Sequence, residues 1–259
     1  PYLCGLMGME VLLFFGGLVA GIINTLAGNG SALTVGLLLA SGYDGAVANA
    51  TNRIGVVGSV IVSWFSLPKT KRKHYLLKSS KELILPTLLG TLIGGLIGVR
   101  MGATAMEWLL AIVMLGMLFS ILTKQSRWSG ASLLDRPKPR WKSWIYFFLI
   151  GFYGGVVQMG IGVLMLIVLV LIDKWSMRDG NVIKIIMANV LSVPAAFIYF
   201  SSDLMAWRPG LILAAGGMIG SWIGARYLVR MPRIQPYVRY LLIAVVAFGS
   251  VQAIIKALT

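Results

Sequence analysis

The chain has 259 residues, of which 58% are hydrophobic and only 12% are charged. A soluble domain carries about 25% charged residues, so this composition excludes an ordinary water-soluble protein and indicates an integral membrane protein. A formal net charge of +15 suggests nucleic-acid binding in a soluble chain. Here the basic residues concentrate in three loops, which the positive-inside rule assigns to the cytoplasm: residues 68–81, 123–142 and 226–239. We therefore expect no nucleic-acid partner, and contacts between these loops and anionic lipids.

The first apolar stretch covers residues 10–40 and is interrupted near its middle by Gly28-Asn29-Gly30. A continuous helix of this length would run about 45 Å, which exceeds the roughly 30 Å of the hydrocarbon core. The stretch therefore either crosses at a steep tilt or turns back at the glycines as a re-entrant hairpin. Three further apolar stretches follow, and each approaches the length of about 20 residues that a spanning helix needs: residues 45–67, 83–101 and 104–122.

The second part of the chain repeats this order after a basic linker, residues 124–143. Its first stretch, residues 144–172, is interrupted at Gly160-Ile161-Gly162, and Asn181 follows Gly162 by the same 19 positions that separate Asn49 from Gly30. Helices are then predicted at 180–200, 209–230 and 237–258. We predict two repeats, residues 1–123 and 144–259, with a substrate site between them.

The basic loops favour the hairpin for both interrupted stretches. If residues 144–172 turn back, all three basic loops lie on one side of the membrane; if this stretch crosses, the arginines of 226–239 fall outside. A hairpin plus three crossing helices gives an odd number of crossings, so the second repeat begins on the opposite side from the first. The predicted fold class is therefore an all-α polytopic membrane protein with two inverted repeats.

Glycines recur at every fourth position in one helix of each repeat, which lets helix backbones approach closely: Gly90, Gly94 and Gly98, matched by Gly216, Gly220 and Gly224. We expect these glycines to pack helices within each repeat, and a homodimer interface is the alternative.

A helix that breaks inside a bilayer leaves backbone groups that protein, water or a ligand must satisfy. The N-terminal ends of half-helices also carry partial positive charge and bind anions. Polar residues surround both breaks: Asn24, Thr25, Asn29 and Ser31 at the first, and Gln158 at the second. These side chains either bind a substrate or only cap the broken ends, and the two roles are compatible.

A second polar group follows each break: Asn49, Thr51, Asn52 and Arg53 in the first repeat, and Asn181 and Lys184 in the second. A cation at such depth costs about 2.5–3.5 kcal/mol and usually faces a cavity or a partner. No carboxylate occurs in the middle of a predicted helix, so these cations favour a pathway for anions. The alternative is that they snorkel to an interface, which fits Lys184 better than Arg53.

These segments resemble the sulfite exporter TauE/SafE family. The resemblance lies in residues 17–30 and 48–53, and in residues 151–155 and 160–162 with Asn181 and Lys184. It implies a permease of two related halves that moves sulfite, sulfonates or other small organic anions across the bacterial inner membrane. The second copy departs from the first, with Gly180 in place of Ala48 and Ile183 in place of Thr51, so the two half-sites are not equivalent.

We therefore expect a transporter, working in export, that binds a small anion between the repeats near the membrane midplane. The candidate substrate residues are Asn24, Thr25, Gly28, Asn29, Gly30, Ser31, Asn49, Thr51, Asn52, Arg53, Gln158, Gly160, Gly162, Asn181 and Lys184. A non-transporting scaffold subunit is one alternative. A membrane-embedded enzyme is another, but it would need paired carboxylates, a histidine cluster or a nucleophile with its base, and the sequence offers none. With one cysteine, Cys4, and one histidine, His74, we expect no metal and no cofactor.

Overall fold

The computed structural model describes residues 2–26, 28–67, 69–122, 141–227 and 235–258. Every regular element within these ranges is a helix, which confirms the predicted all-α class. The first half of the chain contains α1 (Tyr2–Leu26), α2 (Ser31–Ala40), α3 (Gly45–Ser66), α4 (Lys71–Ser79), α5 (Lys81–Val99) and α6 (Ala103–Leu122). The second contains α7 (Trp141–Val156), α8 (Ile161–Leu166), a π-helix η2 (Ile167–Ile172), α9 (Met177–Phe200), α10 (Trp207–Arg226) and α11 (Gln235–Leu258). Most of the predicted basic loops 123–142 and 226–239 lies outside the described residues.

The surface of the molecule is apolar and part of its interior is polar. Phe65, Phe119 and Phe197 are 77%, 72% and 72% exposed, whereas Asn49 and Arg53 are fully buried. By length and composition, three helices in the described ranges can each cross a membrane: Gly8–Leu26, Lys81–Val99 and Met177–Phe200. This distribution fits a protein whose outer surface faces lipid.

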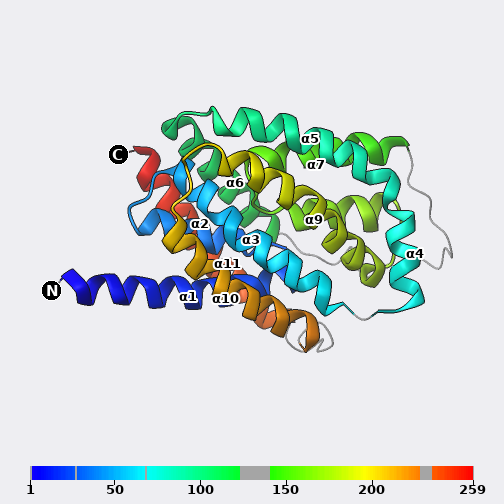
Figure 1. Ribbon diagram of the computed structural model, residues 1–259, viewed down its shortest axis with the longest axis horizontal. Coiled ribbons are helices and arrows are strands. Elements are labelled where there is room, and N and C mark those ends of the chain that lie inside the picture. Colours follow the sequence, from blue (N-terminus) through cyan, green and yellow to red (C-terminus); the bar gives the residue numbers. More distant parts are fainter. Residues whose placement is uncertain (1, 27, 68, 123–140, 228–234, 259) are drawn as a thin grey trace.

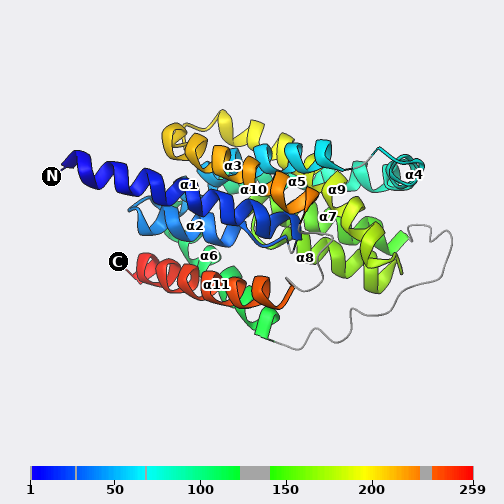
Figure 2. The same cartoon turned by 90° about the horizontal axis from the view of Figure 1, so that it is seen from below.

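Both interrupted stretches double back at their glycines. A methyl group on Gly30 would meet the carbonyl of Ala20, and just beyond the end of α2 the Ser41 hydroxyl donates to the Met9 sulfur at 3.1 Å. Helix α2 therefore returns antiparallel along α1 (Figure 2). In the second stretch the Ser143 hydroxyl, near the start of α7, donates to the Asp173 carboxylate just beyond η2, so α8 and η2 return along α7.

The glycine stripes join the two halves of the chain. A methyl group on Gly94 of α5 would lie 2.0 Å from the carbonyl oxygen of Phe152 in α7, and one on Gly220 of α10 would lie 1.9 Å from that of Leu18 in α1. Figure 1 shows the pairs α5–α7 and α1–α10 side by side. The expectation of packing within each repeat is thus wrong, because α1 and α7 carry complementary glycines of their own: Gly17 and Gly21, and Gly151 and Gly155.

We expect Gly94→Ala and Gly220→Ala each to lower the stability of the protein. The added methyl group forces the paired backbones apart, and overpacking of this kind costs about 1–3 kcal/mol. Thermal unfolding in detergent measures the effect. Gly116→Ala in α6 is the matched control, because nothing lies within 4 Å of its added methyl group; equal midpoints for all three variants would contradict this packing.

Helices α3 and α9 run antiparallel and link the two halves at a second place. The Asn49 amide donates to the Tyr199 hydroxyl at 3.3 Å, and the Asn189 amide donates to the Val60 carbonyl at 3.1 Å. Beyond the end of α3, Arg72 of α4 forms an ion pair with Asp179 of α9. In both views α4 lies at the opposite end of the molecule from the start of α1 and the end of α11 (Figures 1 and 2).

Candidate functional site

The two hairpin tips touch, backbone against backbone. Gly28 has a φ of +80°, and a methyl group placed on it would lie 2.6 Å from the Cα atom of Gly162. A methyl group on Gly162 would likewise lie 2.6 Å from the Cα atom of Gly28. Only glycine combines this left-handed conformation with so close an approach. The two breaks, one from each half, therefore form a single junction.

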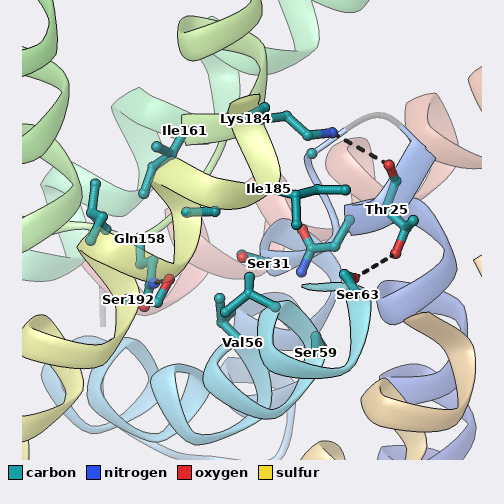
Figure 3. Close-up of a pocket in the computed structure, with 16 residues that line it drawn as sticks. Thr25, Ser31, Val56, Ser59, Ser63, Gln158, Ile161, Lys184, Ile185 and Ser192 are labelled. Atoms are coloured by element: carbon teal, nitrogen blue, oxygen red, sulfur yellow. Dashed lines mark hydrogen bonds between the residues drawn. The ribbon is translucent and has the colours of Figure 1, made fainter. Parts of the chain in front are cut away.

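A cavity of about 60 Å³ opens beside this junction. A buried water needs about 10–15 Å³ on this scale, so the cavity has room for a few waters or one small ion. Both hairpins, α3 and α9 contribute to its wall (Figure 3). Its lining residues are Asn24, Thr25, Gly28, Ser31, Val56, Ser59, Val60, Ser63, Gln158, Ile161, Gly162, Lys184, Ile185, Ala188, Leu191 and Ser192.

Lys184 is the cation of this cavity. Its side chain is 3% exposed, and its ammonium donates to the carbonyl oxygen of Thr25 at 3.3 Å. That carbonyl belongs to the last turn of α1, where carbonyls lack intrahelical partners and the helix dipole is negative. An ammonium has three N–H donors, so this contact leaves donors for a ligand. No Asp or Glu occurs among the lining residues that the structure describes.

Hydroxyl and amide groups complete the wall. The Thr25 hydroxyl lies 3.3 Å from that of Ser63, on the same side as Lys184, while Gln158 and Ser192 lie on the opposite side (Figure 3). The Gln158 amide donates to the Ser192 hydroxyl, and its carbonyl oxygen is buried without a partner. The nitrogen and oxygen of such an amide are assigned from the hydrogen-bond network. Rotation of the amide by a half-turn exchanges the positions of its nitrogen and oxygen.

Arg53 does not line the cavity. Its guanidinium donates to the carbonyls of Gly154 at 3.2 Å, Gly155 at 2.7 Å and Val156 at 3.1 Å, and lies 3.9 Å from the centre of the Tyr199 ring. A cation at this place satisfies the last carbonyls of α7 and the negative end of its dipole. Each half thus supplies a buried cation to the broken helix of the other: Arg53 to α7, and Lys184 to α1.

The other polar residues of α3 hold neighbouring backbone. The Asn49 amide donates to the Val156 carbonyl at 2.8 Å, and the Thr51 hydroxyl accepts from the Ala206 N–H at 3.0 Å. The Asn52 carbonyl oxygen accepts from the Thr34 hydroxyl of α2. These contacts fix the hairpins and the start of α10 against α3.

The predicted substrate residues fall into two groups. Seven line the cavity: Asn24, Thr25, Gly28, Ser31, Gln158, Gly162 and Lys184. Eight lie outside its wall: Asn29, Gly30, Asn49, Thr51, Asn52, Arg53, Gly160 and Asn181. Several of these eight shape the breaks. The Gly30 N–H donates to the Asn24 side chain at 2.9 Å, and Gly160 has a φ of +68° in the turn before α8.

Ser59 and Ser63 line the cavity but are not among the predicted substrate residues. They lie four residues apart in α3 and therefore on one helix face. Val56 and Val60 line the cavity from the same helix. Two serines at this spacing in an apolar helix are the sequence signal for this wall.

The chain matches the family described as Sulfite exporter TauE/SafE over residues 13–253. It is 23% identical over 246 residues to "Probable membrane transporter protein YfcA" of Escherichia coli strain K12, a match covering 92% of this chain and 87% of that protein. It is 22% identical over 231 residues to a "Probable membrane transporter protein" of Haemophilus influenzae, covering 86% of this chain and 87% of that protein. No solved structure gives a significant match.

Proposed function

Because the chain belongs to the sulfite exporter TauE/SafE family, we propose that it is a multi-pass membrane transporter that carries a small oxyanion through the cavity beside Lys184. Sulfite and small sulfonates are the first candidates, and export is the direction that the family's description suggests. The relatives of Escherichia coli and Haemophilus influenzae, both described as probable membrane transporters, support the transport function.

One observation carries the proposal: a lysine 3% exposed, in a cavity at the junction of two broken helices, without an acid in the described wall. A cation in the middle of a membrane protein costs about 2.5–3.5 kcal/mol, and an anion in the cavity offsets that cost. The Thr25 hydroxyl donates to the Gly21 carbonyl at 3.0 Å, so the hydroxyls of Ser31 and Ser192 are the donors for the oxygens of the anion. A cavity of about 60 Å³ favours a small anion over a bulky one.

We assign direct binding to the seven predicted residues that line the cavity, with Ser59, Ser63 and Ser192 added. The eight predicted residues outside the wall then act indirectly, by holding the broken ends in place. In this assignment Arg53 fixes the second hairpin, whereas Lys184 faces the anion.

In this proposal the two halves of the chain, residues 1–123 and 144–259, are inverted repeats. The matched pairings α1–α10 and α7–α5 and the crossed capping by Arg53 and Lys184 support that arrangement. Movement of one half against the other would then expose the cavity to either side in turn. We assign the protein to the bacterial inner membrane, with loops 68–81, 123–142 and 226–239 in the cytoplasm.

Cysteine labelling tests this topology. In a Cys4→Ser background, we expect an impermeant maleimide to label Lys78→Cys only from the cytoplasmic side and Ser201→Cys only from the outside. Both positions are exposed, and they lie near opposite ends of α9. Labelling of both from one side would exclude the inverted arrangement.

Flux through proteoliposomes tests the transport function. Vesicles loaded with sulfite, sulfoacetate, sulfate or chloride, with and without the purified chain, report which anions it carries. We expect protein-dependent release of at least one sulfur oxyanion and none of sodium ions. Release of none of the panel above the empty vesicles would refute the proposal.

A further inference from the structure

A second cavity, of about 390 Å³, lies between the end of α3, the start of α4 and the start of α9. We name it the entrance cavity. It is lined by three cations, Arg72, Lys73 and Arg178, and by Asp179, the one acid among the lining residues that the structure describes. None of its described lining residues is among the candidate substrate residues.

The entrance cavity and the central cavity lie at neighbouring levels of the same two helices. Ser63 of α3 lines the central cavity, and Leu67, one turn further along the chain, lines the entrance cavity. On α9, Lys184 lines the central cavity and Val182 the entrance cavity. At 1.5 Å per residue these steps are only about 6 Å and 3 Å along the helix axes. The entrance cavity thus lies where α3 ends and α9 begins, and α4 closes its wall on the side away from the central cavity.

The charge of the entrance cavity is positive. Arg72 binds Asp179 through two contacts, Nε to Oδ1 at 3.2 Å and Nη2 to Oδ2 at 2.5 Å, and this pair neutralises the acid. Lys73 and Arg178 then leave a net positive wall. Burial, together with the neighbouring charge of Lys69, lowers the pKa of Lys73 below its ordinary value. A bound anion would favour the charged form of Lys73.

We infer that the entrance cavity is a second site for small oxyanions, occupied on the route between the cytoplasmic side and the central cavity. This inference rests on the proposed function, because it takes the same substrate class. Arg178 provides a planar guanidinium that matches two oxygens of a sulfite or sulfonate, and Lys73 provides a point charge. A basic cavity of this kind raises the local concentration of anions in front of the central site.

Equilibrium binding of radiolabelled sulfite to the purified full-length chain, in a neutral detergent, tests the inference. We expect two sites per chain. The double variant Lys73→Gln/Arg178→Gln should lose one site, or weaken it by about tenfold or more, and keep the affinity of the other. Lys184→Gln should lose the other site. The matched control is Lys71→Gln/Lys78→Gln, which removes two charges from the exposed side of α4 outside the cavity and should keep both sites.

The possible results separate this inference from the proposed function. A single site that responds only to Lys184→Gln overturns the entrance site and leaves the proposed transport site standing. No sulfite binding at all overturns both. Equal losses of sulfite binding in the double variant and its control would mean that general surface charge causes the effect, and would overturn the entrance site. Displacement of the second sulfite by a short-chain phosphatidylglycerol, but not by sulfate, would assign the cavity to a lipid headgroup and overturn the inference.

Discussion

Lys184→Gln is expected to reduce sulfite flux by about 10- to 100-fold, because a hydrogen bond to a charged group contributes about 1.5–3 kcal/mol. The folded state should survive. Glutamine keeps an N–H donor for the Thr25 carbonyl, which Lys184 contacts at 3.3 Å, and the change removes a buried charge. Flux in proteoliposomes and the midpoint of thermal unfolding measure the two effects.

Lys78→Gln is the matched control for this experiment. Lys78 is an exposed lysine of α4 and does not line the central cavity, so its loss should leave flux and stability near those of the parent protein. Undiminished flux in Lys184→Gln would remove the lysine from the transport site.

Arg53→Gln, by contrast, is expected to lower the stability of the fold and not the intrinsic flux of the folded protein. The substitution leaves most of the contacts to the carbonyls of Gly154, Gly155 and Val156 unmade, in a fully buried place. The Val156 carbonyl keeps its bonds from the Asn49 amide and the Tyr199 hydroxyl. Buried carbonyls without partners cost about 1–3 kcal/mol each, so the loss at Gly154 and Gly155 should lower the free energy of unfolding by about 3 kcal/mol. Flux should fall only in proportion to the folded fraction.

Arg100→Gln controls for the loss of an arginine at a helix end. Arg100 is exposed at the C-terminal cap of α5, and its replacement should change stability by less than about 0.5 kcal/mol. If Arg53→Gln had the same midpoint of thermal unfolding as the parent protein but lost flux, Arg53 would act on the anion directly, as the sequence alone suggested.

The sequence predicts much of the fold because glycine and charge act locally. The breaks at Gly28 and at Gly160 follow from the length of their apolar stretches and the glycines within them, and both stretches do turn back there. The partner of a glycine stripe cannot be predicted in the same way. Small residues at Gly94 or Gly220 favour close approach to any helix, and the choice between α1 and α7 depends on complementary glycines far away in the chain.

The site is harder to predict than the fold. Lys184 and Arg53 look alike in sequence, since both are cations within an apolar helix and neither has a carboxylate partner nearby. The difference is in the backbone that each one meets: three carbonyls for Arg53, and one carbonyl beside a cavity for Lys184. Contacts between a side chain and a distant helix end have no sequence signature.

The most direct test of the account is an experimental structure of the protein with selenite, whose selenium atom locates the anion by its anomalous signal. We expect a selenium peak in the central cavity, with an anion oxygen within hydrogen-bonding distance of the Lys184 ammonium and the Gly28–Gly162 junction alongside. A peak beside Arg53, with the central cavity empty, would contradict it.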